Sequence, residues 1–319
     1  MISAVIPCYN EDGNIANMHR RLVDVFTKIG TDYQIIFVNN GSIDGSVSTF
    51  QGVVDRDAHV TVISLTRNYG SQSAYSCGLK FATGDCVLCL DGDIQDPPEL
   101  LPEMLAKWAS GYDVVYGVRS HRRGSLVRRI GYKVFYRMFA RLSYIKIPLD
   151  AGDFALLDSR VVQTLNLLPE RDRFLRGLRA WVGFRQTGVE YTRDQREWGE
   201  TSNSLIDNFR WASKGIFSFS YKPLEMISML AGLMVVAAFL GILLYVVLHF
   251  LNQNSPPGFS TLIVLILFLG AIQLASLAII GEYLGRMFEE IKHRPIYLID
   301  EIVSQKGAIK PDPGSGHDA

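Results

Sequence analysis

The chain has 319 residues, of which 48% are hydrophobic, and its mean hydropathy is +0.13. This length holds one complete α/β domain with an appendage, and the hydropathy exceeds that of most enzymes that are soluble throughout, so part of the chain is expected to lie in lipid. The formal net charge is zero, which excludes a globally basic nucleic-acid-binding protein.

Short apolar runs rich in β-branched residues alternate with helical patterns in the first part of the chain, at residues 2–7, 33–39, 60–65, 86–91 and 113–118. This alternation predicts an α/β domain with a mostly parallel sheet covered by helices, and with ligand-binding groups at the carboxyl ends of the strands. The cysteines fall in predicted core segments without disulfide-like spacing, so we expect four reduced thiols: Cys8, Cys77, Cys86 and Cys89.

The first two of these runs end in polar residues. Pro7, Tyr9 and Glu11 lie at the end of the first run, and Asn40 lies at the end of the second. The Tyr9 ring can stack beside a nucleotide base, and the polar groups can accept hydrogen bonds from the ring N–H groups of the base. Each motif by itself also fits an ordinary Asx turn or helix cap, so the interpretation depends on their order and spacing.

Asp91 and Asp93 follow the apolar run at 86–90 and are one residue apart. On an extended strand they point to the same face, as two ligands of one divalent cation must. Asp93 and Gln95 supply the hard oxygen donors that suit Mg²⁺ or Mn²⁺ between two phosphates, and Asp91 can also reach a ribose hydroxyl. Such a metal stabilises a departing nucleoside diphosphate. A solvated Asp-Gly-Asp turn is the alternative, which the preceding strand and the following Gln-Asp-Pro-Pro disfavour.

Residues 119–146 are rich in Lys and Arg and contain no acidic residue. Basic and apolar residues both recur at every fourth position from Arg129 to Leu142, which predicts a helix lying in the membrane interface. Arginines at the start of this segment can neutralise the phosphate of a lipid acceptor through paired hydrogen bonds: Arg119, Arg122, Arg123 and Arg128. General attraction to anionic lipid headgroups is the alternative for each of them.

Two long apolar stretches follow at residues 226–251 and 259–280, with His249 as their only side chain that ionises near neutral pH. Each can span roughly 30 Å of hydrocarbon as a helix. Lys and Arg flank the pair on both sides and are absent from the connector, which predicts that both ends of the chain lie in the cytoplasm. Aromatic and basic residues in 193–223 predict a second interfacial helix. The tail at 301–319 is predicted to be disordered.

Six motifs together resemble the family 2 glycosyltransferases of GT-A fold: IPCYNE, NGSIDGS, LTRNYG, GLKFATGDCVLCLDGDIQDPPE, AGDFALLD and GEYLGRMFEEIKHRPIY. Within the family the chain resembles the polyisoprenyl-phosphate glycosyltransferases, the group of dolichol-phosphate mannose synthases and bacterial undecaprenyl-phosphate glycosyltransferases. The resemblance covers almost the whole chain. The last motif, beside two membrane stretches, is more similar to the bacterial branch than to soluble relatives.

The resemblance implies a nucleotide pocket lined by Pro7, Tyr9, Glu11, Asn40 and Asp91. It implies that Mg²⁺ or Mn²⁺ is held by Asp91, Asp93 and Gln95. It also implies a loop that closes near the diphosphate and contains Arg196 and Ser202. Three residues depart from the family's usual pattern, because Asp is usual at Asn40, a basic residue at Ser71 and Arg at Ala155. The change at Asn40 concerns the affinity for the nucleotide-sugar donor. The changes at Ser71 and Ala155 concern contacts to phosphate or sugar.

Asp153, in the AGDF motif, matches the position near the acceptor that is commonly described as a catalytic base in this family. The attacking group, a lipid monophosphate, has its second pKa near 6 and is mostly dianionic at pH 7. We therefore expect two catalytic carboxylates with different tasks: Asp93 holds the metal, and Asp153 orients the sugar or the attacking phosphate rather than removing a proton. A turn or helix-capping Asp is the alternative for Asp153.

These expectations describe an integral membrane enzyme that transfers a hexose, with inversion, from a nucleotide sugar to a polyprenyl phosphate. By the resemblance, UDP-glucose and undecaprenyl phosphate are the preferred substrates, the enzyme spans the bacterial inner membrane twice, and it self-associates, a tetramer being one candidate. The expected domains are 1–192 (cytosolic and catalytic, with 119–146 at the interface), 193–223 (interfacial), 224–281 (two spans), 282–300 (cytosolic return) and 301–319 (tail).

Three alternatives stay open. A processive polysaccharide synthase shares the nucleotide site but requires a Gln-x-x-Arg-Trp motif, which residues 195–198 do not satisfy. A catalytically silent nucleotide-binding membrane protein is suggested by the three departures from the family pattern, while the intact Asp91, Asp93 and Asp153 argue against it. The third alternative is a transferase of the same kind that uses another sugar: mannose, an N-acetylhexosamine or aminoarabinose.

Overall fold

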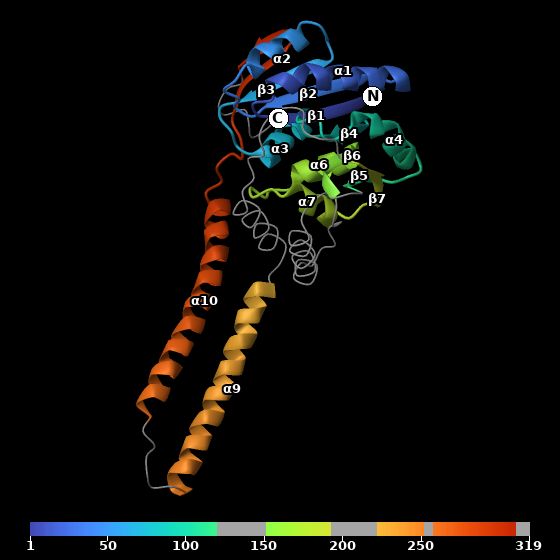
Figure 1. The fold of residues 1–319 in the computed structure, drawn as a ribbon. Helices are drawn as coiled ribbons and strands as arrows, with labels where there is room; N and C mark the ends of the chain where they lie inside the picture. Colours follow the sequence, from blue (N-terminus) through green and yellow to red (C-terminus); the bar gives the residue numbers. More distant parts are fainter. Residues whose placement is uncertain (120–150, 193–221, 252–257, 311–319) are drawn as a thin grey trace.

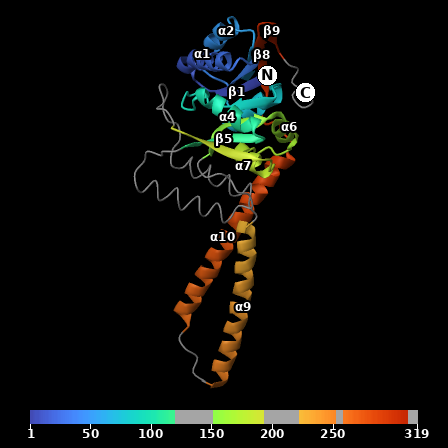
Figure 2. The ribbon, with the colours of Figure 1, turned by 90° about the vertical axis from the view of Figure 1, so that its right-hand side faces the viewer.

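The computed structural model describes residues 1–119, 151–192, 222–251 and 258–310. Most of the two predicted interfacial segments, at 119–146 and 193–223, therefore lies outside the described residues. The described residues form an α/β domain from which two long helices extend side by side (Figures 1 and 2). The α/β class expected from the alternating pattern is confirmed.

Nine strands of the described residues form one mixed sheet with the order β7-β5-β6-β4-β1-β2-β3-β8-β9. Its centre is parallel, as predicted, and consists of β1 (Ile2–Cys8), β2 (Tyr33–Asn39), β3 (Val60–Leu65) and β4 (Cys86–Cys89). On one side β6 (Ala151–Asp158) runs antiparallel to β4 and to β5 (Val114–Arg119), and β7 (Gln186–Tyr191) runs parallel to β5. On the other side β8 (Ile299–Ser304) is antiparallel to β3 and to β9 (Gly307–Ile309).

Helices cover both faces of this sheet. On one face lie α1 (Asp12–Ile29), α2 (Ser46–Val54) and α4 (Leu101–Ala109), which follows the short 3-10 helix η1 (Pro98–Leu100). On the other lie α3 (Ser71–Phe81), α6 (Ser159–Leu167) and α7 (Leu175–Trp181). Because neighbouring side chains of a strand point to opposite faces, Ala4 and Ile6 of β1 join the first core and Val5 joins the second. Apolar burial on both faces explains why the central strands read as continuous apolar runs.

The four cysteines are free and buried, as predicted. Cys86 and Cys89, at the two ends of β4, belong to opposite cores of the domain. The C-x-x-C spacing therefore places the two thiols on opposite faces of the sheet, where they pack as small apolar residues.

The two long helices are α9 (Lys222–Leu251) and α10 (Phe259–Ile291). Both contain a stretch long and apolar enough to cross a membrane, Leu224–Gly241 with a mean hydropathy of 2.0 and Phe268–Ile291 with 1.5. None of the described side chains in either stretch is fully buried in the protein, and in the second stretch Arg286 and Glu290 are half-buried. Such apolar side chains require lipid or a partner around them, in agreement with the two spans expected from the sequence.

The expectation of a disordered tail from residue 301 is wrong for its first part, because β8 and β9 extend the sheet beyond β3. Val303 pairs with Val62, and Ile302 pairs with Ile63. Their side chains continue the two cores at the edge of the sheet. The α/β domain is therefore built from residues on both sides of the long helices.

Candidate active site

The loops that follow β1 and β2 are bonded to one another at the carboxyl edge of the sheet. The Asn10 backbone N–H donates to Ser42 Oγ (3.1 Å), and the Ile43 N–H donates to Asn10 Oδ1 (2.9 Å). Asn10 has a φ of 55°, which Asn tolerates better than most residues. Gly41 has a φ of 73°, and a Cβ there would lie 2.5 Å from the carbonyl carbon of Arg67. Glycine is therefore required where this loop meets the one after β3.

The predicted nucleotide-pocket residues of β1 lie at this edge. Tyr9 is 41% exposed, so its ring is accessible to a ligand. Pro7 is half-buried, and the Glu11 carboxylate accepts a hydrogen bond from the Asn14 side chain (2.5 Å) at the start of α1. The structure thus brings these side chains together beside the loops after β2 and β4, and their contact with a base stays a prediction.

Asn40 is only 3% exposed, and both polar atoms of its side chain have partners within the protein. Its Nδ2 donates to Asn68 Oδ1 (3.1 Å), and its Oδ1 accepts from the Tyr69 backbone N–H (2.9 Å). Asn68 Oδ1 also accepts from the Gly70 N–H (2.8 Å). Asn40 therefore holds the loop after β3 in place. An Asp at this position would accept from Tyr69 but has no hydrogen to give Asn68.

Asp91 and Asp93 do not lie on an extended strand, so the predicted geometry is wrong in this respect. Strand β4 ends at Cys89, and the chain turns through Ile94, which has a φ of 63° and is 3% exposed. Positive φ is rare for a β-branched residue and marks local strain of the kind that gathers at functional sites. The Gln95 backbone N–H donates to Asp93 Oδ1 (3.2 Å) and closes the turn. We call residues 91–96 the carboxylate loop.

Several carboxylates lie close together in and around the carboxylate loop. Asp91 Oδ1 accepts from the Tyr75 hydroxyl (2.8 Å). Burial, followed by the negative charges of Asp96, Asp153 and Asp93, raises the pKa of Asp91 to about 7. A divalent cation between these groups would remove their mutual repulsion. The residues present therefore fit a metal with hard oxygen ligands.

Within the described residues, no group of three or more Asp, Glu, His or Cys side chains is arranged so that it could hold a metal ion. Mg²⁺ and Mn²⁺ do not require one. Mg²⁺ in particular usually takes one or two carboxylates and fills its other positions with water and substrate phosphates. The carboxylates of Asp91 and Asp93 and the carboxamide of Gln95 match this kind of site.

Asp153 lies on β6, beside the carboxylate loop, and is held by two other side chains. Arg176 of α7 donates Nε–H to its Oδ1 (3.0 Å) and Nη2–H to its Oδ2 (2.9 Å), and Gln72 of α3 donates to Oδ2 (3.2 Å). Burial raises the pKa of Asp153, but the charge and hydrogen bonds of Arg176 outweigh it, and the net pKa lies below the ordinary value. A carboxylate held ionised with both oxygens bonded is a weak proton acceptor.

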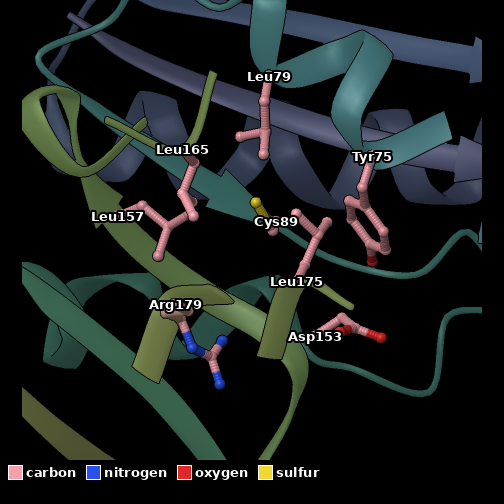
Figure 3. A pocket seen from close by; sticks show the side chains of 8 residues that line it. All are labelled: Tyr75, Leu79, Cys89, Asp153, Leu157, Leu165, Leu175 and Arg179. Atoms are coloured by element: carbon pink, nitrogen blue, oxygen red, sulfur yellow. The ribbon is translucent and has the colours of Figure 1, made fainter. Parts of the chain in front are cut away.

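A small cavity of about 20 Å³, with room for about one water molecule, lies behind Asp153 (Figure 3). Tyr75, Leu175 and Arg179 line it together with Asp153. Arg179 donates to the Gly152 carbonyl (3.2 Å), and burial lowers its pKa to about 10. This mostly apolar space has no room for a ligand larger than about one water molecule.

Arg119 is the one predicted phosphate-binding residue within the described part of the chain. It ends β5, and its guanidinium donates to the Tyr191 hydroxyl (3.3 Å), which in turn donates to Asp96 (2.5 Å). A Cβ built on Gly152 would lie 3.1 Å from Arg119 Nη2, so the guanidinium passes close to the backbone next to Asp153. The other five, Arg122, Arg123, Arg128, Arg196 and Ser202, lie outside the described residues.

The sequence analysis did not predict six residues that surround Asp91 and Asp153: Gln72, Tyr75, Asp96, Arg176, Arg179 and Tyr191. Arg176 and Arg179 are three positions apart on α7 and so share a helix face, which is the only signal the sequence offered for them. Gln72 and Tyr75 lie three positions apart on α3 in the same way. Nothing in the sequence indicates that these two faces meet at Asp153.

Comparison with known proteins identifies the family. Residues 3–165 match the model of glycosyl transferase family 2. The uncharacterized glycosyltransferase sll0501 of Synechocystis sp. is 41% identical over 303 residues, 94% of this chain and 95% of that protein. The prophage bactoprenol glucosyl transferase homolog of Escherichia coli is 35% identical over 303 residues, 94% of this chain and 99% of that protein.

A solved structure of glucosyl-3-phosphoglycerate synthase from M. tuberculosis aligns with 68% of this chain and 78% of that one, with a TM-score of 0.46 and 17% identity. The family assignment rests on the sequence matches instead. Those matches extend over nearly the full length of both partners and include the carboxylate loop and Asp153. The chain therefore belongs to glycosyl transferase family 2 and is a glycosyltransferase.

Proposed function

We propose that this glycosyltransferase transfers glucose from UDP-glucose to a polyprenyl phosphate and forms a polyprenyl-phosphate sugar. The proposal is supported first by the relative named for bactoprenol glucosylation, because the two chains match over nearly their whole lengths. The two apolar helices agree with an acceptor that lies in a membrane. The position of Asp153 beside the carboxylate loop supplies charged groups for both substrates.

Donor binding is assigned to the loops at the carboxyl edge of the sheet. Tyr9 stacks on the base, and Pro7, Glu11, Asn40 and Asp91 line the rest of the nucleotide pocket. Asp91, Asp93 and Gln95 hold Mg²⁺ or Mn²⁺, which when bound neutralises charge on the departing diphosphate. Asn40 is only 3% exposed, so little of its surface is available for direct contact with the nucleotide.

In the reaction, a phosphate oxygen of the lipid attacks the anomeric carbon in line with the bond to the diphosphate. That bond breaks, the nucleoside diphosphate leaves with the electron pair, and the configuration at the anomeric carbon is inverted. The acceptor phosphate arrives without the proton that a base would remove. Asp153, fixed by Arg176 and Gln72, orients the sugar or the attacking phosphate and so contributes through position.

The acceptor phosphate is assigned to Arg119, Arg122 and Arg128, and closure over the diphosphate to Arg196 and Ser202. The guanidinium of Arg119 passes close to Gly152, the residue before Asp153, and this supports the assignment for the first of them. We place the catalytic domain and both termini in the cytoplasm, with α9 and α10 crossing the membrane and interfacial segments at 119–146 and 193–223. Association of copies into an oligomer is part of this proposal.

Transfer in a reconstituted system tests the function. The purified chain in proteoliposomes is incubated with radiolabelled nucleotide sugars, undecaprenyl phosphate and Mg²⁺, and the lipid phase is counted. We expect label in the lipid with UDP-glucose, and its loss when the ions are chelated. Labelling with another sugar nucleotide would reassign the donor. No lipid product with any donor would favour the catalytically silent alternative.

A further inference from the structure

The domain-side end of α10 is bonded to the loop that connects α6 to α7. The Glu290 carboxylate accepts hydrogen bonds from two consecutive backbone N–H groups, those of Arg171 (3.0 Å) and Asp172 (3.2 Å). One helical turn earlier, Arg286 donates to the Asp172 carboxylate (2.7 Å). We call Arg286 and Glu290 the α10 clamp. It joins a helix of membrane-spanning length to the catalytic domain.

The clamped loop leads directly into α7, whose second residue, Arg176, is the bidentate partner of Asp153. At the start of that helix, the Leu175 backbone N–H donates to Gln72 Oε1 (2.8 Å), and the Nε2 of the same Gln72 donates to Asp153. The end of the loop thus leads to Arg176 and bonds to Gln72 of α3, the two residues that fix Asp153. Arg173 bonds to the last carbonyls of α6, at Leu165 and Leu168, and anchors the opposite side of the loop.

The segment that follows α10 also contacts α3, the helix that carries Gln72. The Tyr297 hydroxyl and the Cys77 thiol of α3 are hydrogen-bonded, and Tyr297 packs against the core between α3 and α6. Residues 286–297 therefore contact α3 directly, and they contact α7 through the loop that precedes it. These contacts form a continuous path from α10 to Asp153.

We propose that the α10 clamp is a positioning element for sugar transfer. Arg286 and Glu290 fix the 168–174 loop, the loop sets the start of α7, and α7 places Arg176 on Asp153. The inference rests on the proposed function, in which Asp153 acts through its position. A displacement of about 1 Å in such a group can reduce a rate by roughly 100-fold. The end of the second membrane helix is then part of the catalytic machinery as well as an anchor.

The test compares full-length variants in proteoliposomes. Glu290→Ala removes the acceptor for both N–H groups, whereas Glu290→Gln keeps a carbonyl oxygen at the same distance from the backbone. Glu289→Ala is the matched control, because the neighbouring Glu289 is 64% exposed and pairs with Lys292 on the helix surface. For each variant we measure kcat, the KM for the nucleotide sugar, and hydrogen exchange at the amides of 168–176.

We expect Glu290→Ala to lower kcat by about 10- to 100-fold with the donor KM within about twofold of the parent, to speed exchange at Arg171 and Asp172, and to be largely rescued by Glu290→Gln. Glu289→Ala should match the parent in every measurement. The inference is overturned if Glu290→Ala equals Glu289→Ala in kcat and in exchange. A uniform loss of stability, with kcat per folded enzyme unchanged, would also overturn it.

Glu290→Asp covers the case in which the Ala variant does not accumulate, because it keeps the charge and withdraws the carboxylate by one methylene. An intermediate loss of kcat with faster exchange in 168–176 supports the clamp, and parent-like values in both contradict it. If the parent itself transfers no sugar to any polyprenyl phosphate, the proposed function fails. Hydrogen exchange then still reports whether Glu290 fixes the loop.

Discussion

Asp153 distinguishes two mechanisms, one in which it is a catalytic base and one in which it positions a substrate. A catalytic base must exchange a proton during the reaction, whereas a positioning carboxylate stays ionised throughout. Arg176 and Gln72 occupy both oxygens of Asp153, and the lowered pKa keeps it ionised below the ordinary range of an Asp. Both observations favour the positioning role.

Asp153→Asn should lower kcat/KM by about 100-fold, because an amide cannot satisfy the donors of Arg176 and Gln72 as a carboxylate does. The acid limb of the pH profile of kcat/KM should remain near pH 6 in the variant, since it reports ionisation of the acceptor phosphate. Transfer assays between pH 4.5 and 8 check this. Loss of the acid limb in Asp153→Asn would instead identify Asp153 as the base.

Gly92 is the second residue with a specific prediction, since it lets the carboxylate loop lie against the end of β1. A Cβ there would lie 2.7 Å from Cys8 Sγ and 3.0 Å from the Pro7 carbonyl oxygen. Gly92→Ala should therefore shift Asp91 and Asp93 and lower kcat/KM by at least about 10-fold. The matched control is Gly52→Ala in α2, where no atom lies within 4 Å of the added methyl group.

Gly52→Ala should leave activity unchanged and stabilise the protein by up to about 1 kcal/mol, because Ala is the better helix former. Activity assays and thermal unfolding of both variants in detergent distinguish a local effect from a global one. Parent-like transfer by Gly92→Ala would mean that the tight contact with Cys8 has no bearing on the carboxylate loop.

At the residue scale, the sequence predicted the acidic residues of the site better than the residues that form hydrogen bonds with them. Asp91 and Asp93 follow a recognisable strand, so their place at the sheet edge was predictable, although the turn at Ile94 was not. Arg176 and Gln72 reach Asp153 from helices far apart in the sequence. Only the packing of α3 and α7 on one face of the sheet brings them together, and no local pattern encodes that packing.

Among the elements, the β8–β9 hairpin is the one that the sequence analysis did not predict. Its few apolar residues are followed by Gly, Lys and Pro, a composition typical of a disordered tail. The strands become stable only on the free edge of β3, which lies about three quarters of the chain length earlier in the sequence. The central strands were easier to predict, because burial on both faces gives them unbroken apolar runs.

Val303→Asp tests whether this hairpin stabilises the domain. The charge would replace an apolar side chain that pairs with the buried Val62, so we expect a loss of about 1–3 kcal/mol. Asp300→Ala, a change at an exposed residue of the same strand, should have little effect. Thermal unfolding in detergent measures both. Equal midpoints for the two variants would show that the edge strand adds nothing to stability.

At the scale of the whole molecule, the catalytic domain is assembled from residues before and after the two long helices. Strand β8 follows α10, the α10 clamp lies at the domain-side end of α10, and both contact the part that precedes α9. If α9 and α10 form a hairpin across the membrane, the two parts return to the same side and can combine. The fold therefore agrees with the even number of spans and the common side of both ends proposed from the distribution of Lys and Arg.

Thiol labelling in sealed vesicles of both orientations tests this topology. The native cysteines are all buried, so a membrane-impermeant maleimide reports an introduced cysteine against a low background. Ser255→Cys in the connector should label only from the side opposite the catalytic domain, and Asp300→Cys should label only from the domain side. Labelling of both cysteines from one side would mean that the hairpin enters the membrane without crossing it. The proposed two-pass arrangement would then be wrong, although the domain would still combine its two parts on one side.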